Sequence, residues 1–389
     1  MSETSAAVHP LSGLIPLLHR LARLRWLLCP VGAVEAYAQI RPGTGQPYDL
    51  IRFSEAGGWI VTGRLGDVYA TSFMQGGPLE LLASWALFPF PHQHEAGYAA
   101  VGQQGQIWLR LVTGAALVAV CMLGARRLRT LHRLPRSQPL ELLAGLTAVL
   151  LAVPYYFWAE GHLSQFAVPV MWVAGASLAV RGRTTAAGLV IGLSAGWQSW
   201  GVLAAGLLLV DRRPGPLLRA VAAFVVGALS CYLPFVVTGR FEMFALAWPV
   251  RQLTLVHTLL PQLTEFGWPY RFLQGLVAGL AGVAVALVLG RRRDLVWLGP
   301  LAVVTARLLL DPVLLPNYWY PLLVLAVAGV SLLHPGCSPW RLGLVALLCC
   351  VPHVQNRYVQ DLGVTTIGVT SALITALLVV LRREEPADA

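Results

Sequence analysis

The stretch that decides the fold is "AAGLVIGLSAGWQSWGVLAAGLLLV", residues 186–210. Two apolar halves flank a polar break, and arginine clusters at 181–183 and 211–213 lie on either side. Arginine-rich loops gather on the cytoplasmic side of a membrane, but one helix of this length would put its ends on opposite sides. We therefore predict two half-membrane helices that meet at 196–201 and return to the side they came from. The backbone of the break must then be buried in protein or line a cavity.

The composition agrees with a polytopic membrane protein. Of 389 residues, 57% are hydrophobic and only 12% are charged, outside the range of soluble domains. We predict a single all-α domain, residues 1–389, a bundle of about 10 to 13 membrane helices that includes the re-entrant pair. The other spans are expected near residues 24–40, 107–124, 140–158, 163–180, 217–237, 271–290, 295–310, 318–333, 341–353 and 362–381.

The charge pattern argues against a nucleic-acid partner. The net charge is +10, but the basic residues are all arginines in short clusters between apolar runs, as the positive-inside rule requires. The cysteines show no CxxC spacing and predict neither a zinc site nor a disulfide framework. The clusters predicted to be cytoplasmic are residues 125–136, 181–183, 211–213, 291–293 and 382–383.

The same alternation places residues 41–106, 159–162, 238–270 and 311–317 on the extracytoplasmic side. Residues 77–90 are short for a span, and counting them as one would move 125–136 outside. We expect this segment to dip into the membrane and to return with 95–106, or to tilt strongly. The external segments are too short to fold alone, so the active site would lie over the helical bundle.

The loop 41–77 carries the residue of most chemical interest, Asp49. After it, apolar residues follow at helical spacing with polar residues on the other faces, which predicts a helix lying in the membrane interface and ending at Gly63. Asp49 is either the N-cap of that helix or a catalytic carboxylate at the boundary of water and lipid. The two roles are compatible, because a cap holds a carboxylate in place.

This loop resembles the first extracytoplasmic loop of the GT-C glycosyltransferases, in particular glycosyltransferase family 87, the actinobacterial polyprenol-phosphate-mannose-dependent mannosyltransferases. The pattern is an aspartate, an aromatic, a small residue, a glycine, a tyrosine and a proline before an apolar run. Residues 160–214 and "LPNYWYPLLVLA" (315–326) are similar to the family's middle and terminal span. The chain departs from the family where Gln198-Ser199 stands for a lysine-proline. The matching loop residues are Asp49, Phe53, Ala56, Gly63, Tyr69 and Pro78-Leu79.

The resemblance implies transfer of a hexose, mannose in that family, from a polyprenyl-phosphate sugar to a lipid, glycan or secreted acceptor, with inversion. No cofactor is expected. The metal requirement stays open at this point, although the single acidic residue at the core of the loop argues against a carboxylate-rich divalent site. Asp49 would be the general base. An arginine fork suits the lipid phosphate, and Arg271, Arg307 and Arg52 are the candidates. Arg307 lies inside a span, about one turn from Asp311, which makes it either a functional residue or half of a structural pair. The candidate sugar contacts are Glu160, His162, Tyr69 and Asp311.

Three alternatives remain at this point. Broken helices are also typical of transporters, so a flippase for a lipid-linked sugar is the second hypothesis. A membrane O-acyltransferase needs a histidine inside the bundle, whereas the histidines here lie in loops or near the ends of spans. An inactive scaffold is the third alternative. The expected location is the plasma membrane of a bacterium, with membrane lipids as neighbours and the site on the extracytoplasmic face.

Overall fold

The computed structural model describes residues 14–38, 48–88, 98–159, 161–252, 254–289, 292–313, 315–335, 337–357 and 362–383. Nearly all of them are helical, which confirms the all-α prediction. The β-structure within these ranges is one antiparallel pair, β1 (Trp248–Pro249) with β2 (Glu265–Phe266), and an isolated bridge between Gly76 and Gln198.

The elements follow the predicted spans closely. Those of the N-terminal half are α1 (Leu14–Arg23), η1 (Arg25–Leu27), α2 (Leu28–Ala38), α3 (Tyr48–Val61), α4 (Leu65–Val68), α5 (Pro78–Leu87), α6 (Tyr98–Leu131), α7 (Gln138–Leu150), α8 (Val153–Ala159), α9 (Ser164–Val180), α10 (Thr184–Ser194) and η3 (Ser199–Val210). Those of the C-terminal half are α11 (Pro214–Thr238), η4 (Met243–Ala245), α12 (Leu255–Leu259), α13 (Trp268–Leu289), η5 (Arg293–Leu295), α14 (Leu298–Leu309), η6 (Pro316–Trp319), α15 (Tyr320–Ser331), α16 (Pro339–Arg357) and α17 (Leu362–Arg383).

Several helices are long and apolar enough to cross a bilayer. In the part of the chain that the structure describes, these are Ile107–Leu131 of α6, α11, α13 and Thr366–Arg383 of α17, 4 in all. The pair α7 and α8, bent by 42° between them, raises the number to 5 if it counts as one broken span. By length and composition the chain is therefore a helical membrane protein.

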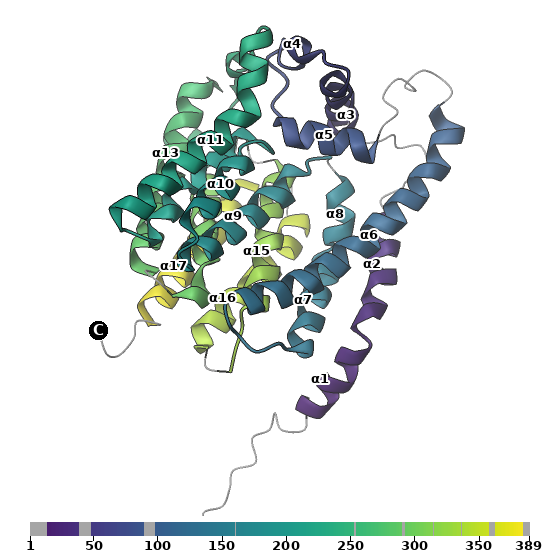
Figure 1. Cartoon of the computed structure of the whole chain (residues 1–389), viewed down its shortest axis with the longest axis vertical. Coiled ribbons are helices and arrows are strands. Elements are labelled where there is room, and N and C mark those ends of the chain that lie inside the picture. Colours follow the sequence, from purple (N-terminus) through teal and green to yellow (C-terminus); the bar gives the residue numbers. More distant parts are fainter. Residues whose placement is uncertain are drawn as a thin grey trace, which may run out of the picture.

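The bundle has two chemically different ends. Figure 1 shows α3, α4 and α5 together at one end, far from α1; we call this the polar end. At the opposite, basic end, Arg129 donates to the carbonyl oxygens of Ser331 and Leu333 at 3.0 and 2.7 Å. There the guanidinium of Arg341 binds Asp294 at 2.6 Å. Arginines at this end thus hold the C-terminal turn of a helix as well as carrying charge.

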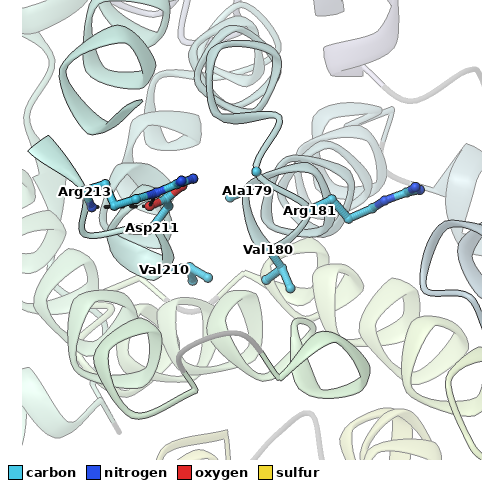
Figure 2. A pocket seen from close by; sticks show the side chains of 7 residues that line it. Ala179, Val180, Arg181, Val210, Asp211 and Arg213 are labelled. Atoms are coloured by element: carbon cyan, nitrogen blue, oxygen red, sulfur yellow. Dashed lines mark hydrogen bonds and ion pairs between the residues drawn. The ribbon is translucent and has the colours of Figure 1, made fainter. Parts of the chain in front are cut away.

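The two predicted helices on either side of the break are present as α10 and η3. Residues 179–182 and 210–213 line one hollow, so the outer ends of the pair lie together (Figure 2). Within that hollow Asp211 binds Arg213 at 2.7 Å. The two helices meet at residues 195–198, where the N–H of Gly77, just before α5, donates to the carbonyl oxygen of Trp197 at 2.9 Å. The break therefore lies beside α5 at the polar end. Two half-membrane helices would instead have placed it midway along the bundle.

The segment 77–90 is too short for a span, as predicted. Its helix, α5, has 10 residues, about 15 Å of length, too short to cross. Figure 1 shows α5 at the polar end beside α3, and α6 runs on continuously from Tyr98 to the basic end. The expected dip or strong tilt of 77–90 stays a prediction.

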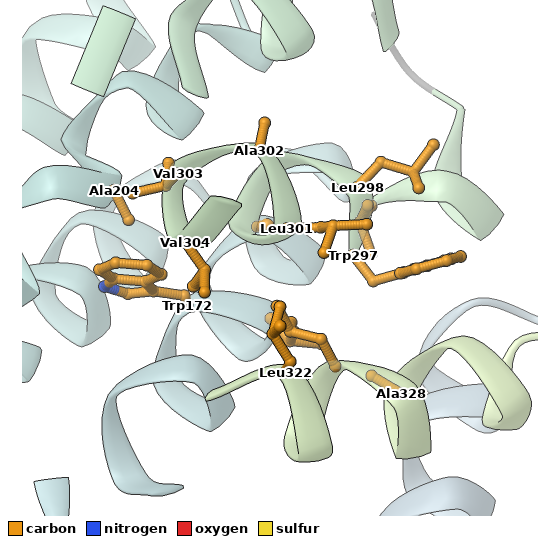
Figure 3. Close-up of a cluster of buried hydrophobic side chains, with 14 of the residues drawn as sticks. Trp172, Ala204, Trp297, Leu298, Leu301, Ala302, Val303, Val304, Leu322 and Ala328 are labelled. Carbon is orange, nitrogen blue, oxygen red and sulfur yellow. The ribbon is translucent and has the colours of Figure 1, made fainter. Parts of the chain in front are cut away.

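The helix α14 is almost completely buried, as is α15. The α14 residues from Leu298 to Thr305 are all buried, packed against Trp172 of α9, Ala204 of η3 and Leu322 of α15 (Figure 3). Because α14 is apolar and enclosed by neighbouring helices, the position of the loop that follows its last turn is fixed. That last turn carries Arg307.

Glycines set the contact between α10 and α11. A methyl group added at Gly188 would lie 1.9 Å from the carbonyl oxygen of Ala220, and one added at Gly192 would lie 2.2 Å from that of Phe224. Small residues four apart let two membrane helices bring their backbones together. The helix that leads into the break is therefore held in place by α11.

We expect Gly188→Ala to lower the free energy of unfolding by about 1–3 kcal/mol, because the clash is with backbone and cannot be relieved by a side-chain rotation. Gly124→Ala is the matched control, since a methyl group there meets nothing within 4 Å. Thermal unfolding in detergent measures both. Equal melting temperatures for the two variants would contradict this account of the contact.

Candidate functional site

Asp49 and His162 meet at the polar end. The Oδ2 atom of Asp49 lies 3.0 Å from Nε2 of His162. The Asp49 side chain is 32% exposed and that of His162 is 15% exposed, so a second molecule can reach the carboxylate. α3 begins at Tyr48, two residues earlier than predicted. Asp49 therefore lies inside the first turn, where the helix dipole stabilises its charge, and is not the N-cap residue.

A glycine makes this contact possible. Gly161 has a φ of +73°, and a methyl group there would lie 2.6 Å from Cβ of Leu50. The start of α3 thus packs directly on the backbone before α9, and only glycine fits both the φ and the space. Phe53, one turn further along α3, meets the ring of His162 edge to face at 5.5 Å between centroids. The imidazole is held from two sides.

A second carboxyl group, Glu80 of α5, lies behind this pair. Its side chain is fully buried, and Oε1 accepts the N–H of Ser164 at 2.9 Å. Oε2 has no hydrogen-bond partner among the described residues. Burial raises the pKa of Glu80 to about 7, against the lowering effect of His162 and Ser164. Glu80 thus anchors the first residue of α9, two positions beyond His162. We call Asp49, Glu80, His162 and Ser164 the carboxylate cluster.

Gln198, in the break between α10 and η3, links the carboxylate cluster to the rest of the site. Its Oε1 accepts three donors: Ser164 Oγ at 2.9 Å, Gln165 Nε2 at 3.3 Å and Trp200 Nε1 at 2.5 Å. The amide oxygen is therefore saturated. The backbone bridge from Gly76 to Gln198 fixes the same residue from the other side.

Arg307 continues the network on the far side of Trp200. Its guanidinium lies between two aromatic rings, 4.5 Å from the centroid of Trp200 and 4.7 Å from that of Tyr318. The side chain is 6% exposed, and Nη1 finds no hydrogen-bond partner in the described part of the chain. A buried N–H without a partner is costly, so this donor is available to an anionic ligand.

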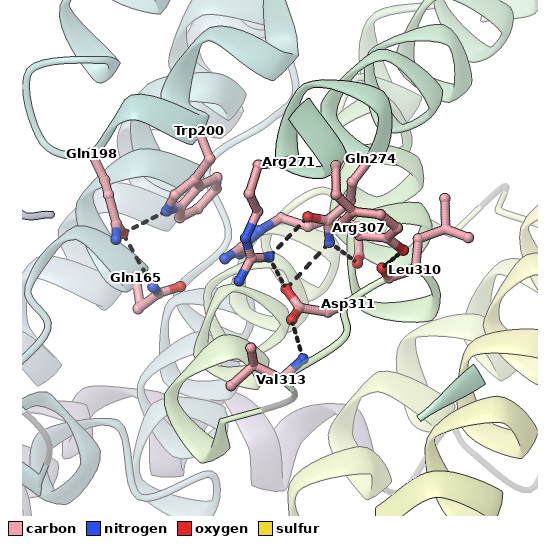
Figure 4. A network of polar contacts seen from close by, with 10 residues as sticks. Gln165, Gln198, Trp200, Arg271, Gln274, Arg307, Leu310, Asp311 and Val313 are labelled. Carbon is pink, nitrogen blue, oxygen red and sulfur yellow. Dashed lines mark hydrogen bonds and ion pairs between the residues drawn. The ribbon is translucent and has the colours of Figure 1, made fainter. Parts of the chain in front are cut away.

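Arg271, by contrast, is already paired. It binds Asp311 at 2.9 Å and Gln274 at 2.8 Å. Burial would raise the pKa of the Asp311 carboxyl, but the two guanidinium groups hold it below its usual value. We call Arg271, Gln274, Arg307 and Asp311 the arginine cluster (Figure 4). Asp311 forms its ion pair with Arg271, and the guanidinium of Arg307 stacks on the rings of Trp200 and Tyr318. The pair of Arg307 with Asp311, one of the two readings from the sequence, is therefore replaced by Arg271 with Asp311.

The remaining predicted site residues are dispersed. Tyr69 is buried and donates from its hydroxyl to the carbonyl oxygen of Gly76 at 2.9 Å, which supports the bridge to Gln198. Arg52 of α3 stacks on Phe73, 4.6 Å from the ring centroid. Glu160 lies outside the described residues.

No protein-family model matches the sequence. No curated protein matches it either. The functional interpretation therefore rests on the side chains of the two clusters and on the resemblance of the loop around Asp49.

The site residues that the sequence analysis did not predict include Glu80 and Gln165. Each had a signal. Glu80 is the one charged residue in "PLELLASWAL", and an ionisable group in an apolar helix is a candidate by default. Gln165 opens an apolar helix. What the sequence could not show is that both lie next to the break at Gln198.

We expect Glu80→Gln to remove a pH dependence of stability. The pKa of the folded carboxyl is about 7, against 4.5 ordinarily, so the folded state binds more protons between these values. Stability therefore falls as the pH rises from about 4.5 to about 7, by about 3 kcal/mol in total. Glutamine keeps the bond to Ser164 and carries no charge.

Melting temperature measured from pH 4.5 to pH 8 tests this. Wild type and Glu80→Gln should agree near pH 4.5 and separate above it, with the variant more stable. Glu265→Gln, at an exposed position, is the control and should follow the wild type. Parallel pH curves for Glu80→Gln and wild type would contradict the assignment.

Proposed function

We propose that this protein is a membrane glycosyltransferase that transfers a hexose from a polyprenyl-phosphate sugar to a hydroxyl group of an acceptor. One observation carries the proposal. A partly exposed carboxylate, Asp49, contacts His162, two residues before Ser164. From Ser164, hydrogen bonds lead through Gln198 to Trp200, and the Trp200 ring stacks on Arg307, whose buried Nη1 has no hydrogen-bond partner among the described residues. A base and an anion-binding group on one rigid network are what transfer from a lipid phosphate needs.

Asp49 is the proposed general base. Its carboxylate is oriented by the bond to His162 at 3.0 Å and remains accessible. A positioned base contributes typically about 10² to 10⁴-fold to a rate. Because His162 is held by Phe53 and by the backbone at Gly161, the carboxylate is positioned before the acceptor arrives.

Arg307 is the proposed phosphate ligand. The two stacked rings hold its planar fork in one orientation, and arginine binds phosphate oxygens through two parallel N–H bonds. The charge of Arg271 is offset by Asp311. This ion pair supports the position of the loop after α14. The arginine cluster thus has one positive charge in excess, which matches the single negative charge of a sugar phosphodiester.

The step is a single displacement. The acceptor oxygen attacks the anomeric carbon while its proton passes to Asp49. The bond between the anomeric carbon and the phosphate oxygen breaks, and its electron pair leaves with the lipid phosphate, whose added charge Arg307 stabilises. The configuration at the anomeric carbon inverts. The resemblance of the loop favours mannose as the hexose, and the positive-inside rule would put the polar end outside the cell.

Asp49→Asn should lower the transfer rate at least about 100-fold, because the amide cannot accept the acceptor's proton. The assay uses the purified protein in lipid nanodiscs with a panel of polyprenyl-phosphate hexoses and a crude lipid extract, read by mass spectrometry. Asp67→Asn is the control: Asp67 belongs to the same segment, and its ion-pair partner within the described part of the chain is the exposed Arg64 at 2.7 Å.

Each outcome decides between the hypotheses. A new glycosylated lipid and free polyprenyl phosphate from wild type and Asp67→Asn, but not from Asp49→Asn, supports the proposal. Unchanged turnover by Asp49→Asn overturns the role of the base. Movement of the donor between leaflets without cleavage of its glycosyl bond would replace the transferase with a transporter.

Arg307→Lys should raise the KM for the donor by roughly tenfold or more, because an ammonium group neither stacks between two rings nor forms a bidentate pair with phosphate. Arg240→Lys changes an exposed arginine near the same end and should leave the KM unchanged. A donor KM in Arg307→Lys equal to that of wild type would move the phosphate site elsewhere.

A further inference from the structure

The amide of Gln198 has a fixed orientation. The indole N–H of Trp200 can only donate, so the Gln198 atom that it meets at 2.5 Å must be the oxygen. The Gln165 atom that meets this oxygen at 3.3 Å must then be a donor, which is Nε2. One indole N–H therefore orients two amides in sequence.

This orientation leaves three hydrogen-bonding groups for something else. The Oε1 atom of Gln165 is buried and has no partner among the described residues, and the side chain is 0% exposed. The two N–H groups of Gln198 make no bond to a described residue, while that side chain is half-buried. A buried acceptor without a partner is as costly as a lost hydrogen bond.

These groups lie between the two ends of the proposed reaction. In Figure 4 the two glutamines lie on one side of the Trp200 ring, and the guanidinium groups of Arg271 and Arg307 lie on the other. In the opposite direction, Gln198 bonds Ser164, which bonds Glu80 of the carboxylate cluster. The two amides therefore lie in the network of contacts that runs from Arg307 through Trp200 to the carboxylate cluster.

The geometry points to a hydroxyl-recognising subsite formed by Gln165 and Gln198, which reads the hexose of the donor while Arg307 holds its phosphate. An acceptor and two donors at the edge of one aromatic ring match the alternating hydroxyls of a sugar. The inference rests on the proposed function and deepens it, because it assigns residues to the sugar itself. Arg307 alone would accept any phosphodiester.

The test compares two lipids of equal charge, an undecaprenyl hexosyl phosphodiester and undecaprenyl methyl phosphate. Mannosyl, glucosyl and galactosyl esters are tried first, and the tightest is used. Dissociation constants come from native mass spectrometry of the full chain in nanodiscs. The variants are Gln165→Met, which removes the buried acceptor at similar volume, and Trp200→Phe, which removes the N–H that orients the amides. Trp297→Phe is the control, a buried indole at the basic end whose Nε1 has no partner among the described residues.

Wild type and Trp297→Phe should bind the hexosyl lipid about tenfold more tightly than the methyl lipid, since a site built to bond hydroxyls rejects ligands without them. Gln165→Met and Trp200→Phe should each bring this ratio close to one. Binding of the methyl lipid by Gln165→Met should stay within about threefold of wild type, because Trp200 and Tyr318 still flank Arg307 in this variant.

A full sugar preference in both variants overturns the subsite and leaves the proposed function intact. If Gln165→Met loses binding of the methyl lipid together with the preference for the hexosyl lipid, the subsite is also overturned, because Gln165 then serves the phosphate. Wild type that binds neither lipid, or both equally, counts against the proposed function itself, and the inference falls with it. Folding is confirmed by the melting temperature of each variant.

Discussion

The polar end depends on one constraint, that the backbone of a broken helix inside a membrane protein must find hydrogen bonds within the protein. At the break between α10 and η3, the carbonyl oxygens of Gly196 and Trp197 accept the N–H groups of Leu79 and Gly77 at 2.7 and 2.9 Å. The carbonyl oxygen of Ala195 accepts the hydroxyl of Tyr232 at 2.8 Å. The break is therefore attached to α5 and α11, and α5 cannot move away without leaving buried groups unpaired.

The attachment of α5 also fixes the carboxylate cluster. α3 packs so closely on α5 that a methyl group at Gly57 would lie 2.2 Å from the carbonyl oxygen of Leu81. Glu80 of α5 binds the first residue of α9, and Asp49 of α3 binds His162 just before it. Three segments remote in the sequence thus meet around one turn. The same break presents Gln198 and Trp200 to Arg307, so both clusters take their positions from it.

The arginines at the two ends of the bundle differ in how their charges are paired. At the basic end Arg129 and Arg341 bind carbonyl oxygens and Asp294, so their charges are satisfied by the fold. At the polar end Arg271 is satisfied by Asp311, whereas Arg307 is stacked between rings that offer no lone pair to its Nη1 atom. Stacking offsets part of the cost of burying a guanidinium and leaves its donors for a ligand.

The sequence by itself determined the all-α class, the location of nearly every apolar helix and the break at Gln198. It also singled out Asp49 as the candidate catalytic carboxylate. These features can be predicted from hydropathy and from the arginine clusters, because each feature depends on local composition. Only the tertiary structure decided that Asp49 binds His162, that Glu80 lies behind them, and that Asp311 pairs with Arg271 and not with Arg307. Those contacts join α3, α5, α9, α13 and the loop after α14, and partners so far apart are set by helix packing, which no local pattern encodes.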